Sequence, residues 1–158
     1  MRVFTDASTM NKLSGIAFVA INAQHDIIFE DAIVITGVDN NTAELEAILF
    51  ALRSLPKTKE QTIILSDSLY ATNCIKRNKC RYFEQEILDE IQETLAAKNG
   101  RVMWIKGHTN DGSFLSIFNK EADSLANRAR KDYISERKKG KRQLAKQRKL
   151  HKRGQQYE

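Results

Sequence analysis

The hydrophobic positions in the first part of the chain form short runs that are typical of β-strands. Residues 2–5, 15–21 and 27–35 are apolar and rich in branched or aromatic side chains. The polar stretches 6–14 and 22–26 separate these runs and contain turn-forming residues. The pattern predicts three antiparallel strands that follow one another along the chain.

The hydrophobic period changes to that of a helix in the next segment. Apolar residues recur at helical spacing within residues 40–55, and Asn40, Asn41 or Thr42 can cap the first turn. Residues 62–65 then form a short apolar run, which is typical of a strand buried on both faces. We therefore expect a central strand directly after the first helix.

The remaining pattern predicts three more helices and one more strand. Residues 69–76 and 83–97 have helical spacing, 101–105 form a fifth strand, and 120–133 form a last helix after the loop 106–118. The order β-β-β-α-β-α-α-β-α predicts an α/β fold. Its five-stranded mixed sheet would have three antiparallel strands, then two parallel ones, and would be flanked by helices.

Charge divides the chain into two parts. Residues 136–158 hold ten Lys or Arg against two Glu, a balance of +8, so the total of +6 leaves −2 for residues 1–135. Residues 1–135 are long and apolar enough for one catalytic domain, whereas 136–158, called the basic tail below, cannot form a core. We expect a flexible or induced-helix tail that attracts polyanions, with a merely solvated segment as the alternative. Its basic residues are Arg137, Lys138, Lys139, Lys141, Arg142, Lys146, Arg148, Lys149, Lys152 and Arg153.

Other features of the composition exclude several classes of protein. No window approaches the ~18 consecutive apolar residues of a membrane helix, and Asp6 interrupts the N-terminus where a signal peptide needs an apolar stretch. We expect a cytoplasmic protein without membrane contact. Cys74 and Cys80 lack further ligands for a zinc site, so two free thiols are expected. The oligomeric state stays open, with a monomer as the default.

Four acidic residues lie on different predicted elements, at positions where their side chains could come together. Asp6 follows the first strand and Asp67 follows the fourth. Glu44 lies in the first turn of the first helix, and Asp123 lies in the last helix. If the first and fourth strands are neighbours, Asp6 and Asp67 emerge side by side. Taken singly, each acid is better explained by a structural role, as a turn former or as a favourable charge at a helix N-terminus, whereas the four together are not.

A cluster of carboxylates predicts bound metal. Gathered carboxylates raise one another's pKa unless divalent cations neutralise them. Oxygen ligands favour Mg²⁺, with Mn²⁺ as the alternative. Two such ions would clamp the attacking water and the leaving oxygen of a phosphodiester, so the expected reaction is phosphodiester hydrolysis.

The acids lie in motifs that resemble the ribonuclease H type I family over roughly residues 1–131. The motifs are FTDAS around Asp6, NNTAELEAI around Glu44, LSDS around Asp67, and WIKGH followed by NKEADSLA, which contains Asp123. The resemblance implies an endonuclease that hydrolyses the RNA strand of RNA–DNA hybrids with two Mg²⁺ ions, leaving 5′-phosphate and 3′-hydroxyl ends. It also implies that Asp6 bridges both ions, that Glu44 and Asp67 complete one, and that Asp123 completes the other.

The resemblance implies further site residues. His108 in the KGH motif matches a loop histidine that assists product departure or proton transfer, although a plain loop residue is the alternative. For Asn40, capping competes with substrate binding. Between His108 and Asp123 the chain is several residues longer than in bacterial cellular enzymes, and a basic, Trp-rich handle is absent. The expected substrate-binding residues are Ser8, Asn11, Asn40, Asn41 and Ser68.

Three alternative functions stay open at this stage. A non-catalytic nucleic-acid-binding module of the same fold would require the loss of one of the four acids, and all four are present. A nuclease of the resolvase or transposase type would lack the NNTAELEAI and KGH motifs together. An interaction protein whose tail does the binding would not need the acids. Asp123 is favoured over Asp111 and Glu121 as the fourth acid because it follows Asn119 at the family spacing.

Overall fold

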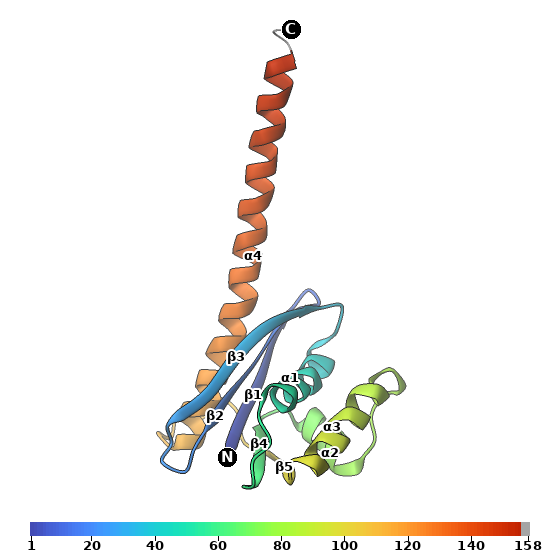
Figure 1. Cartoon of the computed structure of the whole chain (residues 1–158), viewed down its shortest axis with the longest axis vertical. Coiled ribbons are helices and arrows are strands. Elements are labelled where there is room, and N and C mark those ends of the chain that lie inside the picture. Colours follow the sequence, from blue (N-terminus) through green and yellow to red (C-terminus); the bar gives the residue numbers. More distant parts are fainter. Residues whose placement is uncertain (156–158) are drawn as a thin grey trace.

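One mixed sheet forms the centre of the protein, with the strand order β3-β2-β1-β4-β5 (Figure 1). The computed structural model describes residues 1–155. The strands are β1 (Arg2–Met10), β2 (Leu13–Ile21), β3 (Ile27–Thr36), β4 (Thr62–Ser66) and β5 (Gly100–Trp104). The helices are α1 (Asn40–Ser54), α2 (Leu69–Arg77), the 3-10 helix η1 (Tyr82–Glu84), α3 (Gln85–Ala97) and α4 (Phe114–Gln155). β1 to β3 are antiparallel, and β4 and β5 run parallel to β1, so the predicted fold class is confirmed.

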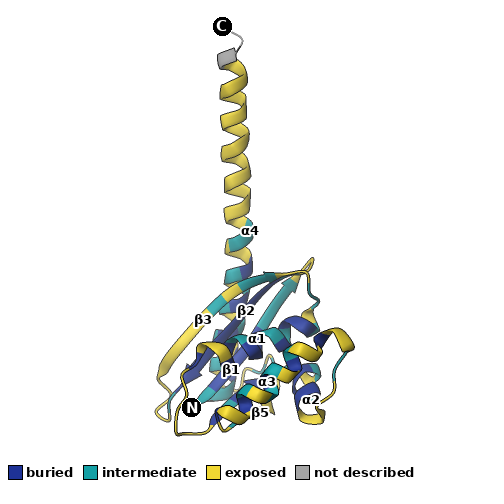
Figure 2. Ribbon diagram, turned by 45° about the vertical axis from the view of Figure 1, so that its right-hand side comes forward, coloured by how far each residue is buried: buried dark blue, intermediate teal, exposed yellow. Residues whose placement is uncertain are grey.

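Helices cover both faces of the sheet (Figure 2). On one face, buried residues of α1, α2 and α3, such as Leu45, Ile48 and Leu88, pack against the strands. On the other face, Phe4 and Ala122 belong to a second buried cluster, under α4. The two thiols are free, with Cys74 buried and Cys80 half-buried. The four carboxylates of interest lie around the middle of β1 and the C-terminal end of β4, where these layers meet.

The first hairpin is longer than the sequence pattern predicts. Residues 6–14, expected to form a turn, instead extend both strands, and only Asn11 and Lys12 make the turn, with φ of 52° and 56°. A two-residue turn with two positive φ angles matches the twist of the strands. The hydroxyls of Thr9 and Ser14 hydrogen-bond each other across the pair at 2.7 Å, which accommodates their polarity in the sheet. Asp6 therefore lies within β1 and not after it.

The N-cap of α1 also differs from the prediction. The Asp39 carboxylate, and not Asn40, Asn41 or Thr42, caps the helix and accepts a hydrogen bond from the Thr42 backbone N–H at 2.8 Å. Aspartate is as good a cap as asparagine, so propensity alone could not decide between neighbours. Glu44 is consequently the fifth helical residue and not a member of the first turn.

A close approach of α4 to the sheet depends on Gly15. A Cβ at Gly15 on β2 would lie 1.9 Å from the Ala126 carbonyl oxygen of α4. Any side chain there would push the helix outward. Because Asp123 lies one turn before Ala126, this glycine also sets how close Asp123 comes to β1.

α4 is far longer than the predicted helix 120–133. It runs for 42 residues, begins inside the expected loop 106–118 and continues through residue 135 without a break (Figure 1). Residues 135–153 are all exposed, so hydrophobic periodicity carries no signal there, although Lys, Arg, Gln and Ala are strong helix formers. Within residues 1–155, no helix is both long and apolar enough to cross a membrane.

Candidate active site

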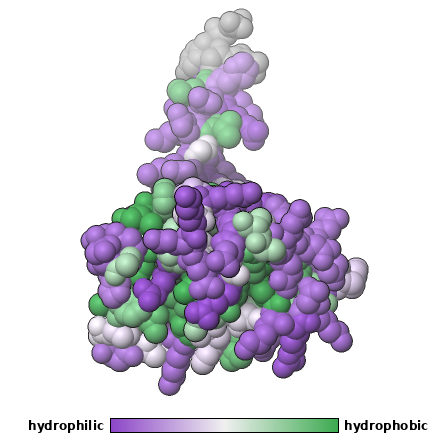
Figure 3. All heavy atoms as spheres, turned by 60° about the horizontal axis from the view of Figure 1, so that its bottom comes forward, coloured by the Kyte–Doolittle hydropathy of each residue, from purple (hydrophilic) through white to green (hydrophobic). Residues whose placement is uncertain are grey.

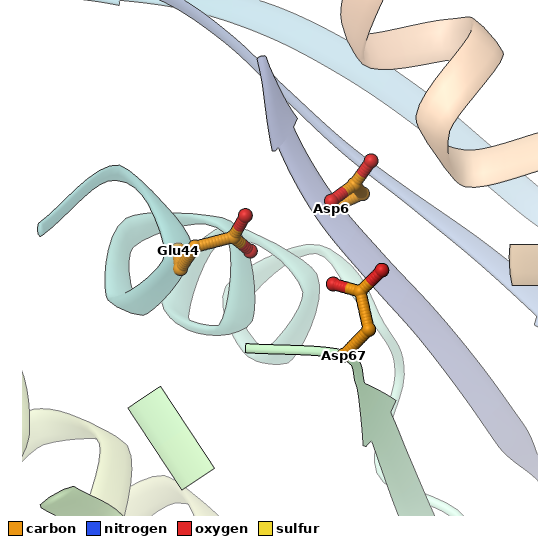
Figure 4. Close-up of side chains that lie close together, drawn as sticks. All are labelled: Asp6, Glu44 and Asp67. Atoms are coloured by element: carbon orange, nitrogen blue, oxygen red, sulfur yellow. The ribbon is translucent and has the colours of Figure 1, made fainter. Parts of the chain in front are cut away.

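Three carboxylates from three segments converge where the parallel pairing of β1 with β4 ends (Figure 4). Asp6 on β1, Glu44 on α1 and Asp67 directly after β4 each offer an oxygen, and these oxygens lie within 4.8 Å of one another. Thr5 pairs with Ser66 across β1 and β4, so the residues that follow them, Asp6 and Asp67, lie next to each other. The strand pairing thus creates the cluster that the sequence pattern predicts.

The electrostatics of this cluster are unfavourable without a cation. Asp6 is only 7% exposed. Its burial, followed by the charges of Glu44 and Asp67, raises the pKa of Asp6 to about 10. Burial and the charge of Asp67 raise the pKa of Glu44 to about 8. At neutral pH the cluster therefore either keeps protons or requires a positive counter-charge.

The donor set fits a divalent cation that prefers oxygen ligands. Among the described residues the cluster consists only of carboxylates, which suit Mg²⁺ or Mn²⁺ better than zinc. The Oε2 atom of Glu44 is buried and has no hydrogen-bond partner in the described chain. A buried unpaired acceptor is costly, and a bound cation would satisfy this one.

Asp67 is held in place by residues from two other segments. The Asn119 amide donates to Asp67 Oδ2 at 3.2 Å, and the Trp104 indole N–H donates to the Asp67 carbonyl at 3.1 Å. A Cβ at Gly107 would lie 2.5 Å from Asp67 Oδ2, so the loop can pass this close only with glycine. These contacts fix the carboxylate against the loop that precedes α4.

Asp123 lies beside the cluster and is positioned by a chain of hydrogen bonds. Hydrogen bonding with Asp123 contributes to the raised pKa of Asp6. The Asn127 amide donates to Asp123 Oδ1 at 3.0 Å, and its own carbonyl accepts from the Ser8 hydroxyl at 2.7 Å. Arg130 Nε in turn donates to Ser8 Oγ at 3.0 Å. This chain joins α4 to β1 and orients the fourth acid.

Three residues that support the site were not predicted from the sequence: Asn127, Arg130 and Trp104. Asn127 and Arg130 lie four and seven residues after Asp123, the spacing that places side chains on one face of a helix. This spacing is the sequence signal that could have placed both residues beside Asp123. Asp111, the rejected alternative to Asp123, instead accepts hydrogen bonds from Ser113 just before α4.

The two serines expected to bind substrate have other partners. Ser8 is part of the chain that leads to Asp123. The Ser68 hydroxyl caps α2 by accepting a hydrogen bond from the Ala71 N–H at 3.0 Å. Both serines lie close to the acids in sequence, but their hydroxyls already stabilise the fold.

The other expected site residues have side chains without such partners. Asn40 is exposed, Asn41 is half-buried, and neither side chain has a hydrogen bond within the described chain. Asn11 lies at the exposed hairpin turn. His108 is exposed in the loop after β5 and has a φ of 53°. These four residues are free to contact a ligand.

Comparison with known families shows to which family this chain belongs. The RNase H family profile matches residues 1–131. The chain belongs to the ribonuclease H family. Ribonuclease H of Tropheryma whipplei strain Twist is 33% identical over 107 residues, which cover 60% of this chain and 63% of that protein. Strain TW08/27 gives the same figures, so the chain spans about 63% of the length of these relatives.

Solved structures of two ribonucleases H1 and of a viral protease-reverse transcriptase share the fold. RNase H1 from the archaeon Halobacterium salinarum NRC-1 has a TM-score of 0.68 and 17% identity and covers 83% of this chain and 97% of its own. LC11-RNase H1 in complex with an RNA/DNA hybrid has a TM-score of 0.72 and 19% identity, and the match covers 84% of this chain and 98% of LC11-RNase H1. The prototype foamy virus protease-reverse transcriptase has a TM-score of 0.71 and 20% sequence identity. The match covers 81% of this chain and 20% of the viral chain. In this ribonuclease H family member, α4 extends beyond the matched residues.

Proposed function

We propose that this protein is a ribonuclease H, an endonuclease that hydrolyses the RNA strand of RNA–DNA hybrids and leaves 5′-phosphate and 3′-hydroxyl ends. The observation that carries the proposal is the cluster of Asp6, Glu44 and Asp67 in a chain of this family. Acids that raise one another's pKa and leave a buried oxygen unpaired are poorly explained by a structural role. A cation-dependent reaction on a phosphodiester accounts for them.

The four acids would hold two Mg²⁺ ions, with Mn²⁺ as a possible substitute. Asp6 would bridge both ions, Glu44 and Asp67 would complete one site, and Asp123 the other. When bound, such ions supply an activated water and stabilise the charge that develops on the phosphate. The protein keeps the carboxylates close together against their repulsion. His108 would assist proton transfer or product departure from its exposed loop.

Recognition of the hybrid would come from polar groups around the acids. The free amides of Asn40, Asn41 and Asn11 can bind backbone or 2′-hydroxyl groups, which distinguish RNA from DNA. Ser8 and Ser68 would have to share their hydroxyls with their present partners, so we assign them a smaller part in binding. The cytoplasmic location and the monomeric state stay predictions from the sequence.

The basic tail would add affinity that is independent of sequence. Residues 136–153 are exposed, and the part of α4 that leaves the body is mostly hydrophilic (Figure 3). Lys and Arg that neutralise phosphates release counterions, and this makes binding strong at low salt and weak at high salt. A protein partner of acidic character is the alternative for the same residues.

The function is tested by comparing substrates. Wild-type protein with Mg²⁺ is expected to cut a matched RNA–DNA hybrid and to leave duplex RNA and duplex DNA of the same sequence intact. Asp67→Asn should bind the hybrid without cutting it, because the amide cannot supply the negative charge that holds the cation. The measurement is gel analysis of labelled strands. Equal cutting of all three duplexes, or full activity of Asp67→Asn, would contradict the proposal.

The contribution of the basic tail is tested without shortening the helix. Replacing the ten Lys and Arg of residues 137–153 by Gln keeps good helix formers and removes the charge. We expect hybrid affinity at low salt to fall at least about tenfold, and the salt slope to decrease by about 0.9 for each phosphate that the variant no longer neutralises. Fluorescence anisotropy titrations at several salt concentrations measure both. A control in which residues 137–153 are scrambled keeps the charge and should bind like wild type; identical titrations for wild type and the Gln variant would refute a role of the tail in binding nucleic acid.

A further inference from the structure

A fully buried carboxylate lies outside the candidate active site. Glu84 in η1 has no exposed surface. Its two oxygens accept hydrogen bonds from Thr42 Oγ1 at 2.7 Å, from Arg81 Nε at 3.1 Å and from the Tyr70 hydroxyl. Burial pushes the pKa of Glu84 upward, but the hydrogen bonds from Arg81, Tyr70 and Thr42 outweigh it and hold the pKa below its usual range. Glu84 is therefore an ionised centre that joins η1, α1 and α2.

Arg81 connects this buried centre to the N-cap of α1. Its Nη1 and Nη2 donate to the two carboxylate oxygens of Asp39 at 2.8 and 3.0 Å. Nη2 also lies 3.0 Å from Glu84 Oε2. The guanidinium lies over the rings of Tyr70 and Phe83, with 5.2 and 4.8 Å to the ring centroids. A flat fork that pairs with two carboxylates and stacks on two rings requires arginine and not lysine.

The first turn of α1 is held at both of its ends by these side chains. Asp39 is the N-cap, and Thr42, the third helical residue, donates to Glu84 and accepts from Arg81 Nη2 at 3.0 Å. Asn40 and Asn41 lie between Asp39 and Thr42, the two residues that Arg81 contacts. Glu44 follows Thr42 by two residues on the same rigid helix, so a shift of the first turn would move Glu44 as well.

We propose that Arg81 and Glu84 are positioning residues for the metal-binding carboxylate Glu44 and for the amides of Asn40 and Asn41. They act through the first turn of α1 and do not touch substrate or metal. The inference rests on the proposed function for its consequence in catalysis, but its consequence for metal binding is independent of the substrate. It also assigns a role to the short segment between α2 and α3, where a basic handle is absent.

The opposite end of α1 supplies a matched control. There Arg53 makes the same kind of bidentate contact, with Nε 2.6 Å from a carboxylate oxygen of Glu90 on α3. This pair ties α1 to α3 but lies more than two turns from Glu44. If these pairs only tied α1 to its neighbours, neither substitution would change metal binding by the folded protein, even though Arg81 is the more buried arginine.

The test compares Arg81→Met with Arg53→Met in the full chain. We expect Arg81→Met to weaken Mn²⁺ binding, measured by calorimetry without substrate, by about 10- to 100-fold, and to lower kcat on the hybrid more than it changes KM. Arg53→Met should leave both within about twofold. Arg81→Lys should restore only part of the binding, because it keeps the charge without the fork.

Each result decides the proposal. Equal metal binding by Arg81→Met and wild type, or equal losses in the Arg81 and Arg53 variants, would overturn it. If Arg81→Met does not fold, Glu84→Gln, which preserves the side-chain volume, takes its place with the same expected loss of Mn²⁺ binding. If the wild type binds Mn²⁺ but cuts no hybrid, the proposed function fails, and the calorimetric comparison still decides whether Arg81 positions Glu44.

Discussion

Asp6→Asn is expected to lower the rate of hybrid cleavage by at least about 1,000-fold, the largest loss of any single substitution in this chain. Asp6 is the most buried of the acids, and all three others contribute to its raised pKa. Asparagine keeps the size of the side chain but removes the charge that would bridge two cations. Single-turnover cleavage of a labelled hybrid with saturating Mg²⁺ measures the effect.

Two other substitutions calibrate this prediction. Asp123→Asn should cost less than Asp6→Asn, because Asp123 lies beside the cluster of three and not within it. Asp132→Asn changes an exposed acid further along the same helix and should stay within about twofold of wild type. If Asp6→Asn cleaved the hybrid as fast as Asp132→Asn, Asp6 would have no role in catalysis.

The stability of the metal-free protein is expected to fall as pH rises. In the folded protein the pKa values of Asp6 and Glu44 are about 10 and about 8, whereas in an unfolded chain they are near 4. Between these values the folded state binds more protons than the unfolded state, so raising the pH favours unfolding. The contribution of the pair is complete below about pH 4 and is lost progressively toward pH 8 to 10.

Thermal unfolding between pH 5 and 9 in the presence of a chelator measures this loss of stability. In a parallel series with Mg²⁺ and no chelator, the loss should be smaller, because the cation neutralises the carboxylates. At pH 8 without metal, Asp6→Asn should be more stable than wild type by at least about 1 kcal/mol, or roughly 2 to 4 °C in Tm. The same substitution thus stabilises the protein and inactivates it. A Tm independent of pH, or a less stable Asp6→Asn, would mean that the acids do not repel one another as their burial implies.

The fold could be predicted from the sequence because its strands and helices bury one face or both. The convergence of Asp6 and Asp67 followed from a single assumption, the pairing of β1 with β4, which the register confirms. The position of Asp6 within its strand was wrong, because polar residues after it resemble a turn although Thr9 and Ser14 satisfy each other across the hairpin.

The polar networks could not be predicted in the same way. Arg81 meets Asp39 across 42 residues of sequence, and no periodicity links them. The exposed half of α4, expected as a flexible or induced-helix tail, gave no signal in the hydrophobic spacing, because this segment buries nothing. Sequence patterns thus located the acids themselves but not the side chains that orient them.

The uninterrupted course of α4 has a mechanical consequence. One helix carries Asp123 at the sheet and Arg153 near its far end, and at 1.5 Å per residue these 30 residues span about 45 Å. At the rise of B-form DNA, about 3.4 Å per nucleotide, this length corresponds to about 13 base pairs. If the basic tail binds the duplex as proposed, a helix of this length would fix the distance between that contact and the carboxylates.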